Sequence, residues 1–349
     1  MADTNTMITF SGGLHDAKFG KIDTPLQAAI LKESDLLTKK GGVKDWLFNT
    51  RKSNKFAETV QYQDDLGLFT ATAEGYAGDP DSFKETYRNI IQHVTFKKDV
   101  FLSMEALQDN NYGLSASMVD DAQSLVRAYY RTQHEIAQQM IYDGNLTEFT
   151  VAKKTYNPVT CDGLPLFHKS HKYGKNGENA LGTQSNYFHT SKELSAEVVD
   201  DIISEISAKI RMMKDEKGNT MGYVLDTLII PGNTPKLEKF VKQYLGSPYE
   251  AKSSNNGINI GYGNYNLIIL PSWEADKETI IGMSSEANKN LLGSVYYDRM
   301  PLDIKSREDE STRNIVVNGT CRFGIGHNTY KHIVRCDIGG EANTNASNL

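Results

Sequence analysis

The chain has 349 residues, of which 39% are hydrophobic, and a formal net charge of −6. This length exceeds one average domain and predicts two lobes, each with a core. The mildly acidic balance argues against tight, charge-driven binding of nucleic acid, because phosphate contacts require a strongly basic face. Three cysteines lie far apart in the sequence and predict reduced thiols instead of a disulfide framework. They are Cys161, Cys321 and Cys336.

The N-terminal ten residues contain no basic stretch followed by an apolar core, so we expect no signal peptide. No apolar run approaches the ~20 residues that cross a bilayer. Together these observations predict a protein that works in a soluble, intracellular setting and has no membrane partner.

The first part of the chain predicts an arm and then a long loop. Residues 1–23 are polar without a sustained period, and 25–39 have the apolar spacing of a helix. Two strand-like stretches, 56–62 and 90–102, flank the glycine-dotted segment 64–83. Hairpin loops usually take 2–5 residues, so a connection of this length predicts a projecting, functional loop.

The tip of this loop carries large apolar side chains that would be costly to leave in water. We expect them to be buried against a neighbouring subunit; the alternative is that the loop folds back on its own domain. These residues are Leu66, Leu68, Phe69 and Tyr76.

Residues 118–142 give the strongest local signal, a single amphipathic helix that Ser117 can cap. At 1.5 Å per residue this helix is roughly 35–40 Å long. Its apolar positions recur in steps of three and four and predict a core-facing stripe, in which polar Gln133 fills one place. The stripe consists of Val119, Ala122, Val126, Tyr129, Ile136 and Met140.

The second half of the chain predicts a compact α/β lobe followed by closing strands. Residues 144–194 show no regular pattern. The lobe and closing elements are expected as helices over 196–214 and 234–244 and as strands over 223–230, 258–260, 265–270, 313–318, 321–325 and 331–338.

A short motif and the order of these parts resemble a known family. Cys161–His171, followed by Gly182–Asn186, is similar to the DG-x-x-LF-x-x-x-H … SN segment of the Mu-like major head subunit group. The stretch Asp309–Asp337, with its Gly324-Ile-Gly326, is similar in style to the closing strands of phage capsid subunits. The chain thus resembles major capsid proteins of tailed bacteriophages, which have the Hong Kong 97-type fold.

The resemblance implies an α+β fold with a particular division of the chain. The expected parts are an N-terminal arm (1–50), an extended loop with its strands (51–110), a peripheral domain (111–194) with a spine helix (117–143), an α/β axial domain (195–310), closing strands of the peripheral domain (311–338) and a disordered tail (339–349).

The resemblance also implies a structural role in the virion. Copies of the chain would assemble in the host bacterial cytoplasm into hexamers and pentamers of an icosahedral shell around phage DNA. Contact with double-stranded DNA would be weak and non-specific, and scaffolding, portal and decoration proteins would be further partners. The founding member of the fold is crosslinked through a lysine of its extended loop. The tip here, Leu66–Ser82, contains no lysine, and the nearest is Lys84, so we expect no crosslink.

Two alternatives remain open at this point. One is an encapsulin-like nanocompartment shell, which shares the fold. The other is a metal-dependent hydrolase that uses Cys161, His168 and His171, since thiol and imidazole groups bind zinc. Their spacing fits no standard zinc pattern, so we expect instead a surface loop whose histidines form local hydrogen bonds. No catalytic residue, cofactor or metal site is predicted.

Overall fold

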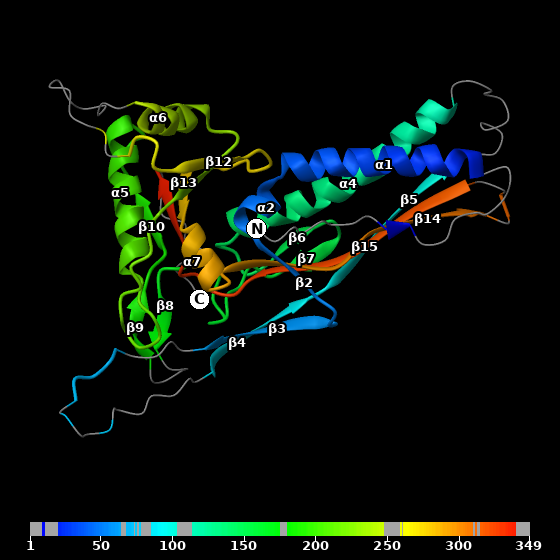
Figure 1. Ribbon diagram of the computed structural model, residues 1–349. Helices are drawn as coiled ribbons and strands as arrows, with labels where there is room; N and C mark the ends of the chain where they lie inside the picture. The colour runs from blue at the N-terminus through cyan, green and yellow to red at the C-terminus, as the bar shows by residue number, and fades with distance from the viewer. Residues whose placement is uncertain are drawn as a thin grey trace.

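The computed structural model describes residues 9–10, 20–63, 68–72, 74, 77, 85–102, 114–174, 180–247, 259, 261–309, 311–312 and 315–339. Two bodies lie side by side in Figure 1. The peripheral body is built on α4 (Leu114–Tyr142) and the long strands β14 (Ser294–Glu308) and β15 (Ile315–His327). The axial body is built on α5 (Ala196–Met212) and a second sheet.

The spine helix predicted over 117–143 is confirmed as α4, and a second helix lies along it. This helix, α1 (Gly20–Lys40), includes the predicted 25–39 and packs beside α4 (Figure 1). The Tyr130 hydroxyl of α4 is hydrogen-bonded to Thr38 Oγ1 at 2.7 Å and Ser34 Oγ at 3.1 Å. The short helix α2 (Val43–Leu47) follows. The sequence assigned to an arm therefore includes a helix docked on the peripheral body.

The peripheral sheet has the strand order β1-β14-β15-β5, and β2 pairs in parallel with β14. Its shorter strands are β1 (Thr9–Phe10), β2 (Asn49–Lys52) and β5 (Val94–Leu102). The two strands predicted over 313–318 and 321–325 form one continuous strand, β15. Gly319 lies within this strand. Its lack of a side chain lets Leu125 of α4 pack closely, because a Cβ at this position would lie 3.0 Å from Leu125 Cδ2.

The axial sheet has the strand order β10-β16-β13-β11-β12. Helix α5 begins at Ser195, whose Oγ accepts a hydrogen bond from Val198 N, and its apolar stripe faces the core. The remaining elements are β10 (Tyr187–Thr190), β11 (Thr227–Pro231), α6 (Pro235–Gly246), β12 (Asn266–Leu270), β13 (Glu278–Met283), α7 (Ser285–Asn290) and β16 (Ile333–Ile338).

Sheet membership differs from the predicted division of the chain. Strand β14 lies inside the predicted axial range 195–310 but pairs with β15 of the peripheral sheet. Strand β16 lies inside the predicted closing strands 311–338 but pairs with β13 and β10 of the axial sheet. Both strands mix apolar and charged residues, so their composition does not tell which sheet they join.

The stretch 144–194 is more ordered than its sequence indicates. It contains the hairpin of β6 (Phe149–Val151) and β7 (Lys154–Tyr156) and that of β8 (His171–Gly174) and β9 (Ala180–Gln184). The first turn uses Ala152 and Lys153 at positive φ, 49° and 60°, where Asn-Gly is the usual signal. The predicted tail beyond Gly339 and strand 258–260, except Asn259, lie outside the described residues. None of the described helices has an apolar stretch long enough to cross a membrane.

Candidate functional site

The hairpin of β3 (Ala57–Gln63) and β4 (Glu85–Gln92) carries the long loop. It is seated on the face of the peripheral sheet opposite α4, where Val60 and Ile91 pack against Val295 and Tyr297. Two glycines of β15 allow this close approach. At Gly326 a Cβ would lie 2.8 Å from Ile91 Cδ1, and at Gly324 it would lie 3.1 Å from the Gln92 carbonyl oxygen. The two glycines of Gly324-Ile-Gly326 therefore let the base of the hairpin pack directly against the backbone of β15.

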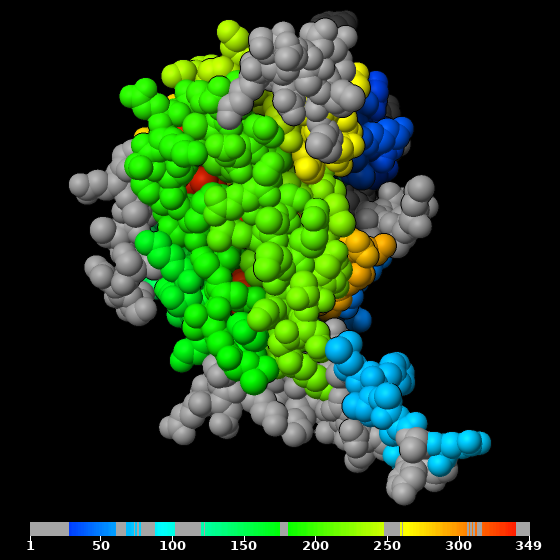
Figure 2. All heavy atoms as spheres, turned by 90° about the vertical axis from the view of Figure 1, so that its left-hand side faces the viewer, coloured from blue at the N-terminus to red at the C-terminus, as the bar shows by residue number. Residues whose placement is uncertain are grey.

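The described residues of the loop stand clear of both bodies in Figures 1 and 2. Leu68 is 80% exposed, and Phe69 is fully exposed. Both side chains project into water at a large hydrophobic cost, as a surface meant for burial in an assembly would. Leu66 and Tyr76, the other two predicted contact residues, lie outside the described residues.

The predicted spine stripe faces the core where its side chains are described. Val126, Tyr129, Ile136 and Met140 are buried. The side chains of Val119 and Ala122 lie outside the described part of the helix.

Gln133, the polar member of the stripe, is buried as well. Its Nε2 donates a 2.6 Å hydrogen bond to the Tyr296 hydroxyl, which fixes α4 to β14.

His168 and His171 are buried inside the fold and Cys161 is half-buried, so the expectation of a surface loop is wrong, although the histidines do form local hydrogen bonds. His171 is fully buried and His168 is 7% exposed. Among the described residues, no three His, Cys, Asp or Glu side chains are grouped as a metal site requires. Burial raises the pKa of the Cys161 thiol to about 12, which keeps it protonated and unreactive.

Each histidine of this group has a structural partner. His168 Nδ1 accepts a hydrogen bond from Ser170 N. His171 Nδ1 donates to Asp162 Oδ2 at 2.7 Å, and its ring stacks on Tyr330 with centroids 3.7 Å apart. Burial disfavours the charged form of Asp162, but the hydrogen bond and charge of His171, together with hydrogen bonds from Thr160 and the Leu164 amide, outweigh it and hold the pKa of the carboxyl below its usual range. The motif therefore joins the 160–172 loop to the segment before β16.

A second pair of buried histidines joins the two bodies, and no sequence pattern indicated it. Ser294 Oγ lies 3.0 Å from His327 Nδ1 and 2.9 Å from His332 Nε2. His327 Nε2 donates to the carbonyl oxygen of Met140 in α4. Burial lowers the pKa of His327 to about 4, and burial with the adjacent His327 lowers that of His332 to about 3.

We expect this pair to make the fold acid-labile. The unfolded chain takes up protons near pH 6.5, whereas the folded chain takes them up only near pH 4 and 3. Stability is therefore lost as the pH falls below 6.5, by roughly 2 kcal/mol per histidine at pH 5. Urea unfolding at pH 7 and pH 5 measures this loss. In His332→Gln, the loss of unfolding free energy between pH 7 and pH 5 should be smaller by roughly 2 kcal/mol, the contribution of one histidine. An equal loss in the variant and the wild type would show that His332 does not cause the acid lability.

Arg335 of β16 ties the end of the spine helix to the axial sheet. Its Nη1 donates to the Tyr142 carbonyl oxygen at 2.7 Å, and its Nε donates to Asp337 Oδ1 at 2.8 Å. The guanidinium lies over the rings of Phe167 and Trp273, at 5.7 and 5.5 Å from their centroids. Only a planar cation can form these hydrogen bonds and lie over both rings, so arginine is the side chain that joins the two bodies here.

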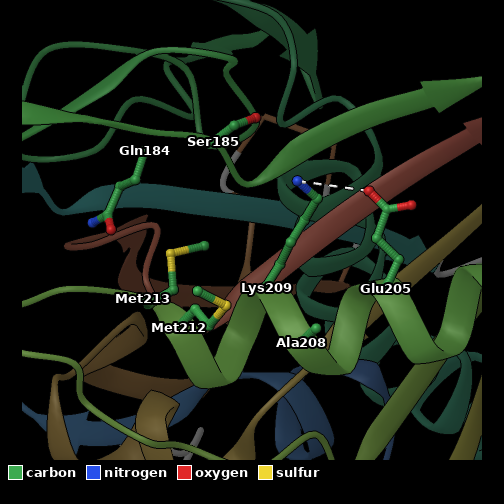
Figure 3. A pocket seen from close by; sticks show the side chains of 7 residues that line it. All are labelled: Gln184, Ser185, Glu205, Ala208, Lys209, Met212 and Met213. Atoms are coloured by element: carbon green, nitrogen blue, oxygen red, sulfur yellow. Dashed lines mark ion pairs between the residues drawn. The ribbon is translucent and has the colours of Figure 1, made fainter.

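A shallow hollow of about 220 Å³ lies beside α5 (Figure 3). Its charged groups, Lys209 and Glu205, are one turn apart on the helix with 3.7 Å between Nζ and Oε1. Met212 is largely exposed at its edge, while Met213 is buried. The pair is an ordinary i,i+4 helix contact. The Ser185 hydroxyl of the lining donates its hydrogen bond to the Tyr187 carbonyl oxygen at 2.6 Å.

Comparison with known proteins finds likeness in structure only. No family model matches the sequence, and no curated protein matches it. A capsid of a native GTA particle matches over 97% of this chain and 96% of that chain, with 11% identity and a TM-score of 0.50. A structure of Mycobacterium phage Patience matches over 96% of this chain and 92% of that one, with 12% identity and a TM-score of 0.49. The chain therefore has the Hong Kong 97-type capsid fold that its sequence resembles.

Proposed function

We propose that the chain is the major capsid protein of a tailed phage and assembles with copies of itself into the shell that encloses the DNA. The observation that carries this proposal is a capsid fold over nearly the whole chain, combined with an exposed apolar loop. The loop has no burial site on its own subunit among its described residues, which favours the neighbouring subunit over folding back.

Assembly of this kind needs many modest contacts. Burying one Leu or Phe side chain contributes about 1.5–3 kcal/mol, less the cost of ordering the loop. Each subunit both offers a loop and receives one, and such head-to-tail contacts close into rings and shells. Because every subunit is held by several neighbours, weak individual contacts suffice for a stable particle.

The remaining parts of the proposal follow from charge and chemistry. A subunit of net charge −6 contacts packaged DNA weakly and without sequence preference. The buried histidines have structural partners and the Cys161 thiol has a raised pKa, which supports a non-enzymatic role. The location is the virion, after assembly in the host cytoplasm, with scaffolding, portal and decoration proteins as further partners.

Replacing Leu68 and Phe69 together by Ser tests the loop contact. We expect the protein concentration needed for shells to rise about 100-fold, since roughly 3 kcal/mol of burial is lost at each contact. Light scattering over a dilution series measures this concentration. The control is Thr70→Ser, an exposed position in the same segment. Unchanged assembly of the double variant would contradict a role for these side chains between subunits.

A further inference from the structure

A pocket of about 190 Å³ lies between α4 and the peripheral sheet. Its floor is apolar and buried, and consists of Leu125 of α4, Leu302 of β14 and Cys321 of β15. Its rim includes half-buried Ala128 of α4 and exposed Lys98 of β5, so a side chain from outside the subunit can enter it. An apolar cavity of roughly 150 Å³ holds a benzene ring, and this pocket therefore has room for one aromatic side chain.

The loop of the same subunit cannot reach this pocket. Its hairpin packs through Val60 and Ile91 on the face of the sheet opposite α4, whereas the pocket lies on the α4 face. In Figure 1 the described loop residues are the light-blue segment at the lower left, while α4 and β5 extend to the upper right. A loop that fills the pocket therefore belongs to another copy of the chain.

The loop carries an aromatic side chain that has no burial site on its own subunit. Phe69 is fully exposed, and a ring of this size is costly to leave in water. The walls of the pocket contain two further rings, Phe96 of β5 and Tyr129 of α4. Aromatic rings stabilise one another in offset or edge-to-face contact. Phe69 therefore matches the pocket in size and in chemistry, whereas the neighbouring Leu68 has no ring.

The charge around the pocket is opposite to that of the loop. Lys97 and Lys98 of β5 are exposed, and neither forms an ion pair within the described part of the subunit. Glu74, the described acid of the loop, is exposed too and follows Phe69 in the same segment. Loop 64–82 contains no lysine, arginine or histidine. Complementary charges at an exposed rim contribute little energy but orient a partner, so the ring supplies the affinity and the charges set its direction of entry.

We propose that the pocket between α4 and the peripheral sheet receives Phe69 from the loop of a second copy of the chain, with Glu74 of that loop facing Lys97 and Lys98. This inference rests on the proposed function and names the surface that receives the loop. The pocket is open in the isolated subunit, and the ring that enters it is exposed there, so neither side has to unfold before they meet. A closed ring of subunits linked in this way fills every pocket and buries every Phe69.

A double-mutant cycle tests the contact. Phe69→Ser removes the ring, and Ala128→Leu fills the pocket from its rim on α4. Each change should raise the protein concentration needed for shells about tenfold. The two together should raise it no further than either alone, because both abolish the same contact. Independent effects, about 100-fold in the double variant, would overturn the pairing. An equal effect of the control Ala28→Leu, which adds the same bulk at an exposed position of α1, would also overturn it.

A cysteine pair tests the same contact directly, whatever the strength of assembly. The variant combines Phe69→Cys with Ala128→Cys, and its shells are oxidised mildly with glutathione disulfide. We expect covalent multimers on a non-reducing gel, since a disulfide forms only where two Cα atoms lie within about 7 Å of each other. The matched control, Phe69→Cys with Ala28→Cys, should run as single subunits. Burial raises the pKa of the three native thiols, so they stay protonated and do not compete.

The outcomes separate this inference from the proposed function. Shells of the Phe69→Cys, Ala128→Cys variant that give no covalent multimers would overturn the contact in the pocket and leave the capsid function in place. Failure of the wild-type chain to form shells would reject the proposed function and this inference with it.

Discussion

Replacing Asp65–Asp81 by a short Gly-Ser turn should leave a folded subunit that no longer forms shells. The replaced segment begins beyond β3 and ends before β4, so the hairpin seat on Gly324 and Gly326 remains. A short flexible turn costs little loop entropy. The burial that is lost lies between subunits, so light scattering should show single subunits or small rings that retain a cooperative melt.

Wild-type protein prepared in parallel should form large particles. Intact shells from the shortened variant would contradict the role of the loop as a clamp between subunits. Loss of the cooperative melt would show instead that the loop belongs to the core of its own subunit.

Val126→Pro should unfold the subunit. Val126 is fully buried in the middle of α4, where proline removes a backbone hydrogen bond and clashes with the preceding turn at a cost of ~3 kcal/mol or more. The break would also separate the Tyr129 and Ile136 turns of the stripe from the peripheral sheet. We expect insoluble protein, or a soluble fraction without helical circular dichroism.

Val126→Ala is the matched control, because it removes only two methyl groups and leaves the helix backbone intact. That variant should remain folded with a loss of about 1–3 kcal/mol. Helical, soluble Val126→Pro protein with an unchanged melt would contradict the structural role of α4.

The elements with a long repeated pattern could be predicted from the sequence. The predicted stripe, from Val119 to Met140, extends over about six turns of helix, which makes its period clear. The loop was recognisable because 64–83 is too long and too rich in glycine for a turn. Strand β14 was not predicted, because its six charged residues hide the alternation of a strand. The partners of β16 were not predictable either, because its sequence does not indicate which sheet it joins.

In the candidate site, too, some features could be predicted from the sequence and others could not. The exposure of Leu68 and Phe69 fits the prediction of a projecting loop, and their contact with a neighbouring subunit stays a prediction. The meeting of His327 and His332 at Ser294 was not predictable, because it depends on contacts between segments that only the structure reveals. The burial of His171 was equally hidden: a Lys- and His-rich segment reads as surface unless its partners, Asp162 and Tyr330, are known.

Negative-stain electron microscopy of the purified, full-length chain tests the central claim most directly. The account predicts closed shells, or hexameric and pentameric rings, formed by this chain alone or on concentration. A population that stays as separate single subunits at all concentrations would contradict it.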